Sequence, residues 1–161
     1  MTHTITAANI AQMNPLDVHA LYELRVEVFI NEHQAPYKEI DSTDADSRTI
    51  HLLAWDDATR TLDGTARIFP STFEGADVIQ FGRFAIAKKA RGTGLGAQIM
   101  DEALRLAEAT APGQSVFLNA RTPLVDYYSS YGFDKCGEPF EESRIPHQPM
   151  ILRRNRSGAE Y

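Results

Sequence analysis

The sequence predicts one α/β domain with a mixed sheet, on three observations. Short apolar runs separated by polar turns predict strands, and two of these runs are close enough to form a hairpin. Longer runs with apolar residues three and four positions apart predict amphipathic helices. At one place a strand, a helix and a second strand follow one another, and this order predicts that the two strands pair in parallel within the sheet. The 161 residues show no repeat or linker, so we expect a single domain over residues 1–161.

Composition narrows the function classes. A net charge of −6 and a pI near 5.3 argue against nucleic acid or an anionic membrane as partner, because both need a basic face. The single cysteine, Cys136, excludes an intrachain disulfide, and no Cys/His spacing for a metal site is present. The first residues have neither a basic start nor an apolar core, and no run approaches membrane-spanning length. We expect a cytoplasmic protein without a metal.

The N-terminal elements begin with an edge strand over His3–Ala7. A helix follows, because Asn14 is a capping residue, Pro15 suits the first helical position and Asp17 favours the helix dipole. Apolar residues at helical spacing continue this helix to Phe29.

The segment Glu32–Asp46 is polar and contains Pro36, so it should be a loop. Two interpretations stay open, a solvated loop or an acidic wall for a cationic substrate. The carboxylates concerned are Glu32, Glu39, Asp41, Asp44 and Asp46.

The next two strands form a hairpin over Thr49–Trp55 and Leu62–Phe69, joined by a short polar turn. Pro70–Asp77 should connect the hairpin to a further strand, Val78–Ala87. This last strand leads into a glycine-rich turn.

That turn, Arg91–Gly96, contains three glycines in five residues. Glycines allow positive φ angles and a close approach of backbone N–H groups to a ligand. The following helix adds unpaired N–H groups and the positive end of its dipole, so the turn suits a phosphate or diphosphate. A nucleotide triphosphatase loop is excluded because Gly96 is followed by Ala97-Gln98, and a dinucleotide fingerprint has a different last spacing.

The remaining elements follow in order. The helix after the turn should run to Ala111-Pro112-Gly113, and Ser115–Asn119 should be a buried strand parallel to the strand before the turn. Thr122 should cap another helix that Gly132 closes in the left-handed conformation. Phe133–Cys136 should start the last strand region, and Phe140–Glu142 and Met150–Arg153 are weaker strand candidates around a turn at residues 144–147.

Two motifs together carry a family resemblance. Arg91-x-x-Gly94-x-Gly96 is similar to the diphosphate loop of the GCN5-related N-acetyltransferase (GNAT) superfamily, and Tyr128, four residues before Gly132-Phe133, is similar to that superfamily's tyrosine. A narrower resemblance, to ElaA-like acetyltransferases, rests on residues 25–32, 36–41 and 145–150.

The resemblance implies a GNAT fold, with a mixed, mostly antiparallel sheet of about six to seven strands flanked by helices. A splayed parallel strand pair would form the acetyl-CoA cleft. Many members carry Asn or Gln seven residues before the tyrosine to contact the pantetheine arm, and this sequence departs from them with Arg121. Two alternatives stay open: Asn119 takes over this contact, or Arg121 reaches a phosphate. Lys88, Lys89 and Arg91 offer charge for phosphates. The cofactor contacts so implied are Phe84, Ala85, Ile86, Arg91, Gly92, Thr93, Gly94, Leu95, Gly96, Asn119, Arg121 and Tyr128.

Thioester aminolysis needs a proton donor for the thiolate and a base for the amine. The resemblance makes Tyr128 the donor, while Tyr127 and Tyr131 are expected to pack. The base stays open among His147, His33, Glu32, Glu39 and Asp41; His147 is favoured because a histidine titrates near neutral pH, and Glu32 is kept as a second candidate. Cys136 is expected to be an apolar filler rather than a nucleophile.

The leading hypothesis is an acetyl-CoA-dependent N-acyltransferase that moves an acetyl group to a small or peptidyl amine by direct attack in a ternary complex. Two alternatives stay open, a non-catalytic acyl-CoA-binding module and an enzyme that acylates oxygen or forms a lactone. Oligomeric state is not fixed by the sequence, and a homodimer stays open.

Overall fold

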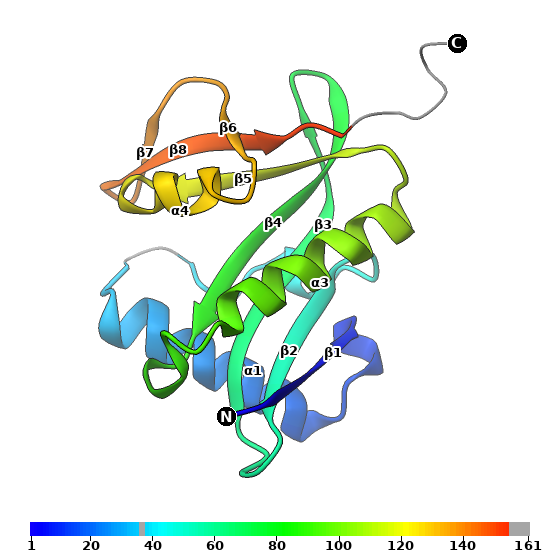
Figure 1. The fold of residues 1–161 in the computed structure, drawn as a ribbon, viewed down its shortest axis with the longest axis vertical. Coiled ribbons are helices and arrows are strands. Elements are labelled where there is room, and N and C mark those ends of the chain that lie inside the picture. The colour runs from blue at the N-terminus through cyan, green and yellow to red at the C-terminus, as the bar shows by residue number, and fades with distance from the viewer. Residues whose placement is uncertain (36–37, 155–161) are drawn as a thin grey trace.

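The computed structural model of the protein describes residues 1–35 and 38–154. Within these ranges, eight strands form one sheet in the order β1-β2-β3-β4-β5-β8-β6, and β7 pairs with β8 (Figure 1). The strands are β1 His3–Ala8, β2 Ile50–Asp56, β3 Leu62–Phe73, β4 Ala76–Ile86, β5 Ser115–Arg121, β6 Asp134–Lys135, β7 Phe140–Glu142 and β8 Ile145–Leu152. The mixed, mostly antiparallel sheet is confirmed. It has one strand more than the six to seven that the resemblance implies, and β6 and β7 fall on the strand candidates at 133–136 and 140–142.

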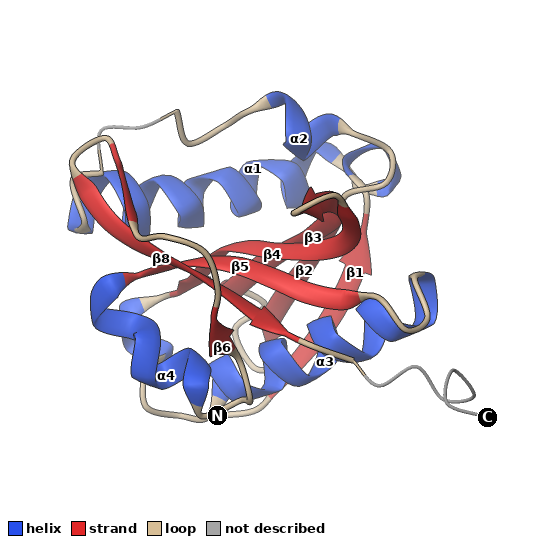
Figure 2. Ribbon diagram, turned by 90° about the horizontal axis from the view of Figure 1, so that it is seen from above, coloured by secondary structure: helices blue, strands red, loops and turns tan. Residues whose placement is uncertain are grey.

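The helices cover both faces of the sheet. They are α1 Pro15–Arg25, α2 Ser42–Ala45, α3 Leu95–Thr110 and α4 Val125–Ser129, with the π-helical segment η2 Val26–Glu32 and the 3-10 turns η1 Ile10–Gln12, η3 Lys88–Ala90 and η4 Thr122–Leu124. Figure 2 shows α1 and α2 on one face and α3 and α4 on the other.

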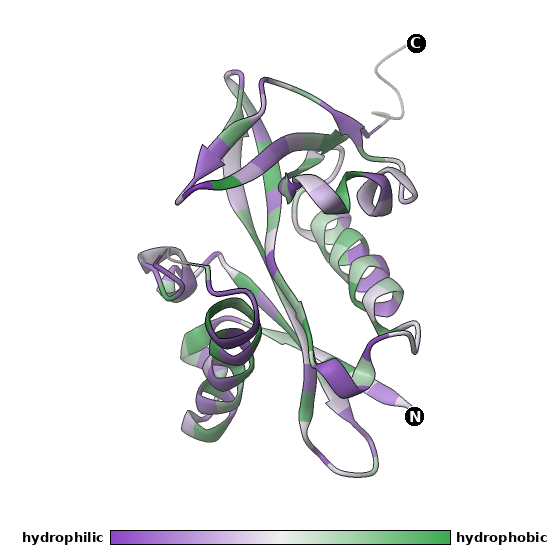
Figure 3. Ribbon diagram, turned by 90° about the vertical axis from the view of Figure 1, so that its left-hand side faces the viewer, coloured by the Kyte–Doolittle hydropathy of each residue, from purple (hydrophilic) through white to green (hydrophobic). Residues whose placement is uncertain are grey.

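The main core lies between the sheet and α3. Hydrophobic and hydrophilic residues alternate around α3 (Figure 3) because only one side of this helix meets the sheet. Buried residues of this side and the strands beneath it include Leu95, Ile99, Met100, Ala103, Leu52, Ile68, Phe81 and Leu118. A smaller cluster joins α1 and η2 to the opposite face through Leu24, Val28, Phe29 and Ala85.

Helix α1 begins as predicted. The side chain of Asn14 accepts a hydrogen bond from the N–H of Asp17 at 2.9 Å, and Pro15 takes the first helical position. The regular helix ends at Arg25, earlier than expected, and continues as η2. Wider π-helical turns of this kind are often found at functional sites, and η2 brings His33 to the cleft described below.

The β3–β4 hairpin is longer than predicted. Pro70–Asp77 is not a connecting loop, because strand pairing continues to Phe73 and Ala76 and leaves a two-residue turn. Both turn residues, Glu74 and Gly75, have positive φ (50° and 79°), as a tight hairpin turn requires. The proline is tolerated because β3 has lost its β2 partner by that point.

Two C-terminal predictions are wrong. Thr122 does not cap a helix; it opens the η4 turn, which has no side-chain cap, and α4 follows. Residues 144–147 are not a turn, since β8 already begins at Ile145, and the tight turn is Ser143-Arg144 with φ of 50° and 66°. Gly132 has φ of 98°, which confirms its left-handed conformation.

Strands β4 and β5 form the predicted parallel pair, but only over residues 78–80 and 115–117. Beyond these residues the two strands separate (Figure 1). Arg83 adds a bulge to β4 opposite β3, with φ of 48°. The part of β4 past Gln80 therefore has no strand partner on the β5 side.

Candidate functional site

The glycine-rich turn presents free backbone donors at the start of α3. Gly92 and Gly94 have φ of 77° and 87°, values that glycine adopts without strain. Helix α3 starts at Leu95 with no side-chain cap and no acidic residue in its first turn. Its first N–H groups are thus available to an anion, and the helix dipole favours one there.

Gly96 packs closely against two aromatic side chains at this turn. A Cβ atom at Gly96 would lie 2.9 Å from the hydroxyl oxygen of Tyr127 and 3.4 Å from the ring of Phe84. Thr93, whose hydroxyl donates to the carbonyl oxygen of Ala90 at 2.6 Å, holds the turn instead of lining the adjoining cavity.

The separated strands enclose two adjoining cavities. The first, the glycine-turn cavity, has a volume of about 520 Å³. Its walls include most of the predicted cofactor contacts: Phe84, Ala85, Ile86, Arg91, Gly92, Gly94, Leu95, Gly96 and Tyr128. Tyr127 and Tyr131 also line it, and Tyr127 is 37% exposed, so these two tyrosines do not simply fill the core as expected.

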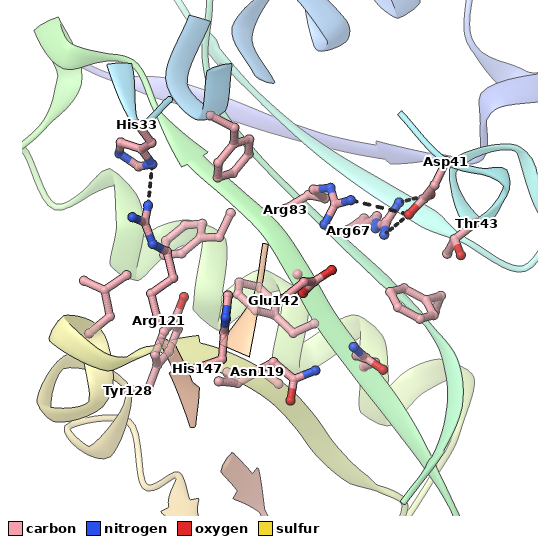
Figure 4. Close-up of a pocket in the computed structure, with 18 residues that line it drawn as sticks. His33, Asp41, Thr43, Arg67, Arg83, Asn119, Arg121, Tyr128, Glu142 and His147 are labelled. Carbon is pink, nitrogen blue, oxygen red and sulfur yellow. Dashed lines mark hydrogen bonds and ion pairs between the residues drawn. The ribbon is translucent and has the colours of Figure 1, made fainter. Parts of the chain in front are cut away.

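The second cavity, the polar cavity, has a volume of about 390 Å³ (Figure 4). Its charged and polar walls are His33, Asp41, Thr43, Arg67, Gln80, Arg83, Asn119, Arg121, Tyr128, Glu142 and His147. Asn119 and Arg121 lie here and not in the glycine-turn cavity, which differs from the expected pantetheine contact. Tyr128, His33, Phe84 and Leu124 line both cavities.

Tyr128 lies in the wall between the two cavities. It is 7% exposed, and its ring packs edge-on against Phe133 and Tyr127. Burial raises the pKa of its hydroxyl, so the phenol stays protonated at neutral pH. Among the described residues its hydroxyl has no hydrogen-bond partner, and Figure 4 shows it directed into the polar cavity.

His147 presents one free ring nitrogen to the polar cavity. Its Nδ1–H donates to the carbonyl oxygen of Ile145 at 2.7 Å, and its ring stacks on Phe140 with centroids 5.4 Å apart. This hydrogen bond fixes the tautomer, because a carbonyl oxygen can only accept. Nε2 therefore carries the lone pair, and no described residue donates to it.

His33 and Arg121 meet across the cleft. The Nη1 atom of Arg121 donates to Nδ1 of His33 at 2.7 Å, as the dashed line in Figure 4 shows. Burial lowers the pKa of His33, and the charge of Arg121 lowers it further, so His33 is neutral at pH 7. Its Nδ1 lone pair is already used, which makes His33 a poorer base than His147.

Glu32, the second candidate base, lies outside the walls of both cavities. Both of its carboxylate oxygens accept from Nη2 of Arg91, at 2.8 and 3.0 Å, and Nε of Arg91 donates to the carbonyl oxygen of Ile86. The pair ties η2 to the glycine-rich turn, so we assign Glu32 no role in proton transfer.

The described part of the acidic segment is not simply a solvated loop, because Glu39 and Asp44 are buried. Asp41 does line the polar cavity, but it is paired with arginines there. Three of its carboxylates pair with three arginines in a network that is mostly buried. We call this set the ion-pair network: Glu39, Asp41 and Asp44 with Arg25, Arg67 and Arg83. Its charges balance, so it leaves no net negative charge for a cationic substrate.

The network controls the ionisation of its own carboxylates. Although burial opposes ionisation, the hydrogen bonds and charge of Arg67 lower the pKa of Asp41 to about 2. Burial raises the pKa of Glu39, whose Oε2 is buried without a hydrogen-bond partner among the described residues. The signal for this network was Arg25 on the apolar side of a helix and Arg67 inside a buried strand, since a charge at a core position requires a partner.

A second group of ionisable residues lies away from the cleft. His3, Asp56 and Asp63 offer ligand atoms within 4.8 Å of one another. However, Asp63 already accepts from His3 at 2.8 Å and from Lys89 at 3.1 Å, and Asp56 accepts two backbone N–H bonds. Lys89 is therefore a partner of Asp63, and its ammonium group disfavours a cation there.

Cys136 lies outside both cavities, packed with Val78, Phe117 and Ile151. Burial raises the pKa of its thiol, so the neutral thiol is favoured, as expected of a structural cysteine. In the described part of the chain, no helix combines the length and apolar character needed to cross a bilayer.

Comparison with known proteins matches this geometry to a family. The acetyltransferase (GNAT) domain model matches residues 16–154. The chain belongs to the GNAT acetyltransferase family. ElaA of Escherichia coli is 31% identical over 140 residues, which cover 87% of this chain and 90% of ElaA.

Two crystal structures agree with this membership. An acyl-CoA N-acyltransferase from Pseudomonas aeruginosa is 36% identical, with a TM-score of 0.84 over 93% of this chain and 99% of that one. Escherichia coli ElaA has a TM-score of 0.84 at 28% identity, over 94% of this chain and all of that one (100%). The ElaA-like resemblance and the GNAT fold are thereby confirmed, and acyl transfer is the general activity that they support.

Proposed function

We propose that this GNAT protein transfers the acetyl group of acetyl-CoA to a primary amine by direct attack in a ternary complex. One observation carries the proposal: Tyr128 stands between a cavity bounded by free backbone donors and a polar cavity that contains an unpaired imidazole nitrogen. A donor molecule in the first cavity and an acceptor in the second would meet at its hydroxyl.

The glycine-turn cavity suits coenzyme A in two ways. The N–H groups of residues 92–96 and the positive end of α3 would bind the diphosphate. The free edge of β4 at Phe84–Ile86 would bind the amides of the pantetheine arm and the thioester oxygen, where fixed donors stabilise developing negative charge.

The chemistry then needs two proton movements. The amine nitrogen attacks the thioester carbon while His147 Nε2 takes the proton that the nitrogen loses. The carbon–sulfur bond breaks, and the leaving thiolate receives a hydrogen bond or proton from Tyr128. Because burial raises the pKa of Tyr128, a hydrogen bond to the thiolate is favoured over full transfer of the proton.

The test is an assay of acetyl-CoA turnover with a panel of amines, in which the free thiol released from acetyl-CoA is measured. We expect Tyr128→Phe to lower kcat at least about tenfold and to leave the Kd for acetyl-CoA within about threefold. Tyr22→Phe removes a hydroxyl outside both cavities and is the matched control.

Unchanged turnover in Tyr128→Phe would remove this residue from the mechanism. Binding of acetyl-CoA without turnover on any amine would instead favour the alternative of a non-catalytic acyl-CoA-binding module. Trapping an acetylated Cys136 by mass spectrometry would overturn direct transfer.

A further inference from the structure

Arg121 carries a positive charge into the wall of the polar cavity, and no carboxylate among the described residues balances this charge. The other two arginines of its walls, Arg67 and Arg83, belong to the ion-pair network, where three arginines meet three carboxylates. Arg121 has no carboxylate partner within residues 1–35 and 38–154; its one described partner is the neutral ring of His33.

The guanidinium of Arg121 keeps most of its hydrogen-bonding capacity. A guanidinium has five N–H donors in a fixed planar arrangement, and the bond to His33 uses one of them. The remaining donors suit a carboxylate, which accepts two parallel hydrogen bonds from such a group. A half-buried guanidinium with free donors and no counter-charge is a site for an anion.

Strand register places this anion site beside the candidate base. Arg121 on β5 is the direct antiparallel partner of His147 on β8, and His147 is in turn the partner of Phe140 on β7. Side chains of direct partners lie on the same face, with Cβ atoms about 4.5–5.5 Å apart. The anion site and the imidazole that would take the amine proton are therefore neighbours.

The other charges that face the cavity do not compete for this position. Glu142, the one unpaired carboxylate of the described walls, is exposed at the β7 tip, where its partner is Ile145 and not His147. A carboxylate at this outer rim is placed to attract the ammonium group of an arriving molecule.

We propose that the acceptor is an amine that also carries a carboxylate close to the nitrogen, as a free amino acid does, and that Arg121 binds this carboxylate. The inference rests on the proposed acyl transfer and narrows its acceptor. It replaces the expectation of a simple cationic amine, because the carboxylates expected to recognise one are neutralised in the ion-pair network.

The decisive experiment compares matched acceptors that differ in one charge. Amino acids and their carboxamides are assayed as pairs with saturating acetyl-CoA, in the wild type and in Arg121→Gln and Arg121→Lys. We expect kcat/KM to favour the free carboxylate at least about tenfold in the wild type. This preference should disappear in Arg121→Gln and survive in part in Arg121→Lys, with the KM for acetyl-CoA unchanged. Arg105→Gln, at an exposed residue outside both cavities, is the control.

Three results would overturn the inference. Equal transfer to acids and amides would show that the cavity does not recognise the carboxylate, although the proposed function would stand. A rise of about tenfold in the KM for acetyl-CoA in Arg121→Gln would assign Arg121 to a phosphate of the donor.

The third result applies if the protein acetylates no amine, an outcome that would contradict the proposed function. Calorimetry of N-acetyl amino acids and their amides with the CoA-loaded protein then tests Arg121 without turnover, and equal affinities would overturn the inference. Circular dichroism of each variant distinguishes a local effect from loss of fold.

Discussion

Asp44 is the most buried carboxylate of the ion-pair network, and Asp44→Asn tests what the network contributes to stability. Its side chain is 1% exposed. It accepts from Nη1 and Nη2 of Arg25 at 2.7 and 3.1 Å, from Nη1 of Arg67 at 2.8 Å and from the backbone N–H of Asp41 at 3.1 Å. Asparagine keeps the size of the side chain but removes the charge that two buried guanidinium groups share.

The expected magnitude follows from this geometry. Removing one partner of a buried ion pair typically costs about 3–5 kcal/mol, because the other charge stays buried without compensation. The amide oxygen of asparagine still accepts one hydrogen bond, so we expect a loss of about 2–4 kcal/mol in the free energy of unfolding. With a urea m-value of about 2 kcal/mol per molar, the unfolding midpoint should fall by about 1–2 M.

Urea unfolding followed by circular dichroism and by Trp55 fluorescence measures this shift. Asp46→Asn is the matched control, since Asp46 lies in the same segment but pairs with the exposed Arg48; its midpoint should not move measurably. If Asp44→Asn unfolded at the same urea concentration as this control, the network would not contribute to stability as argued.

Two further predictions concern Asp41 and His147. The pKa of Asp41 is about 2 in the folded protein, against 3.8 for an ordinary aspartate. Its contribution to stability is therefore complete above about pH 4 and is lost as the pH falls toward 2, so urea midpoints across this range should drop by the equivalent of about 1–2 kcal/mol. A smaller drop in Asp41→Asn than in the wild type would support the assignment. For His147 as base, His147→Gln should lower kcat/KM by about a hundredfold. The exposed His19→Gln is the control for that experiment, and unchanged kcat/KM in His147→Gln would exclude His147 as the base.

The parts of the site that were predictable from the sequence are local in the chain. The glycine-rich turn could be identified because Gly92, Gly94 and Gly96 follow a strand and open a helix. Tyr128 could be placed beside it through the family resemblance, which rests on its position four residues before Gly132-Phe133. Both depend on contiguous residues and on one crossover connection, whose handedness is nearly always the same.

The acceptor side could not be predicted in the same way because long-range pairing builds it. Asp41 meets Arg67 across 26 positions of sequence and Arg121 meets His33 across 88, so neither contact leaves a periodic signal. The position of Arg121 beside His147 depends on the register of β5 against β8. The composition of the acidic segment alone indicates a solvated loop or an acidic wall, because the arginines that neutralise it lie elsewhere in the chain, in α1, β3 and β4.

The ion-pair network has a positional role in addition to stability. Arg83 adopts a left-handed conformation at the β4 bulge, which costs a non-glycine residue about 1–2 kcal/mol. Its guanidinium is held at 3.2 Å from Oε1 of Glu39 and 3.4 Å from Oδ2 of Asp41, so the network can keep the bulge in place. The bulge directly precedes Phe84–Ile86, the stretch proposed to bind the pantetheine arm.

This arrangement separates two tasks within one cleft. The ion-pair network, to which α1, β3, β4 and the acidic segment contribute, holds the β4 bulge next to the donor side of the cleft. Arg121 on β5 and His147 on β8 make none of its ion pairs, although Asp41, Arg67 and Arg83 of the network also line the polar cavity. Acceptor preference can therefore change through substitutions on these strands without loss of the fold or of acyl-CoA binding.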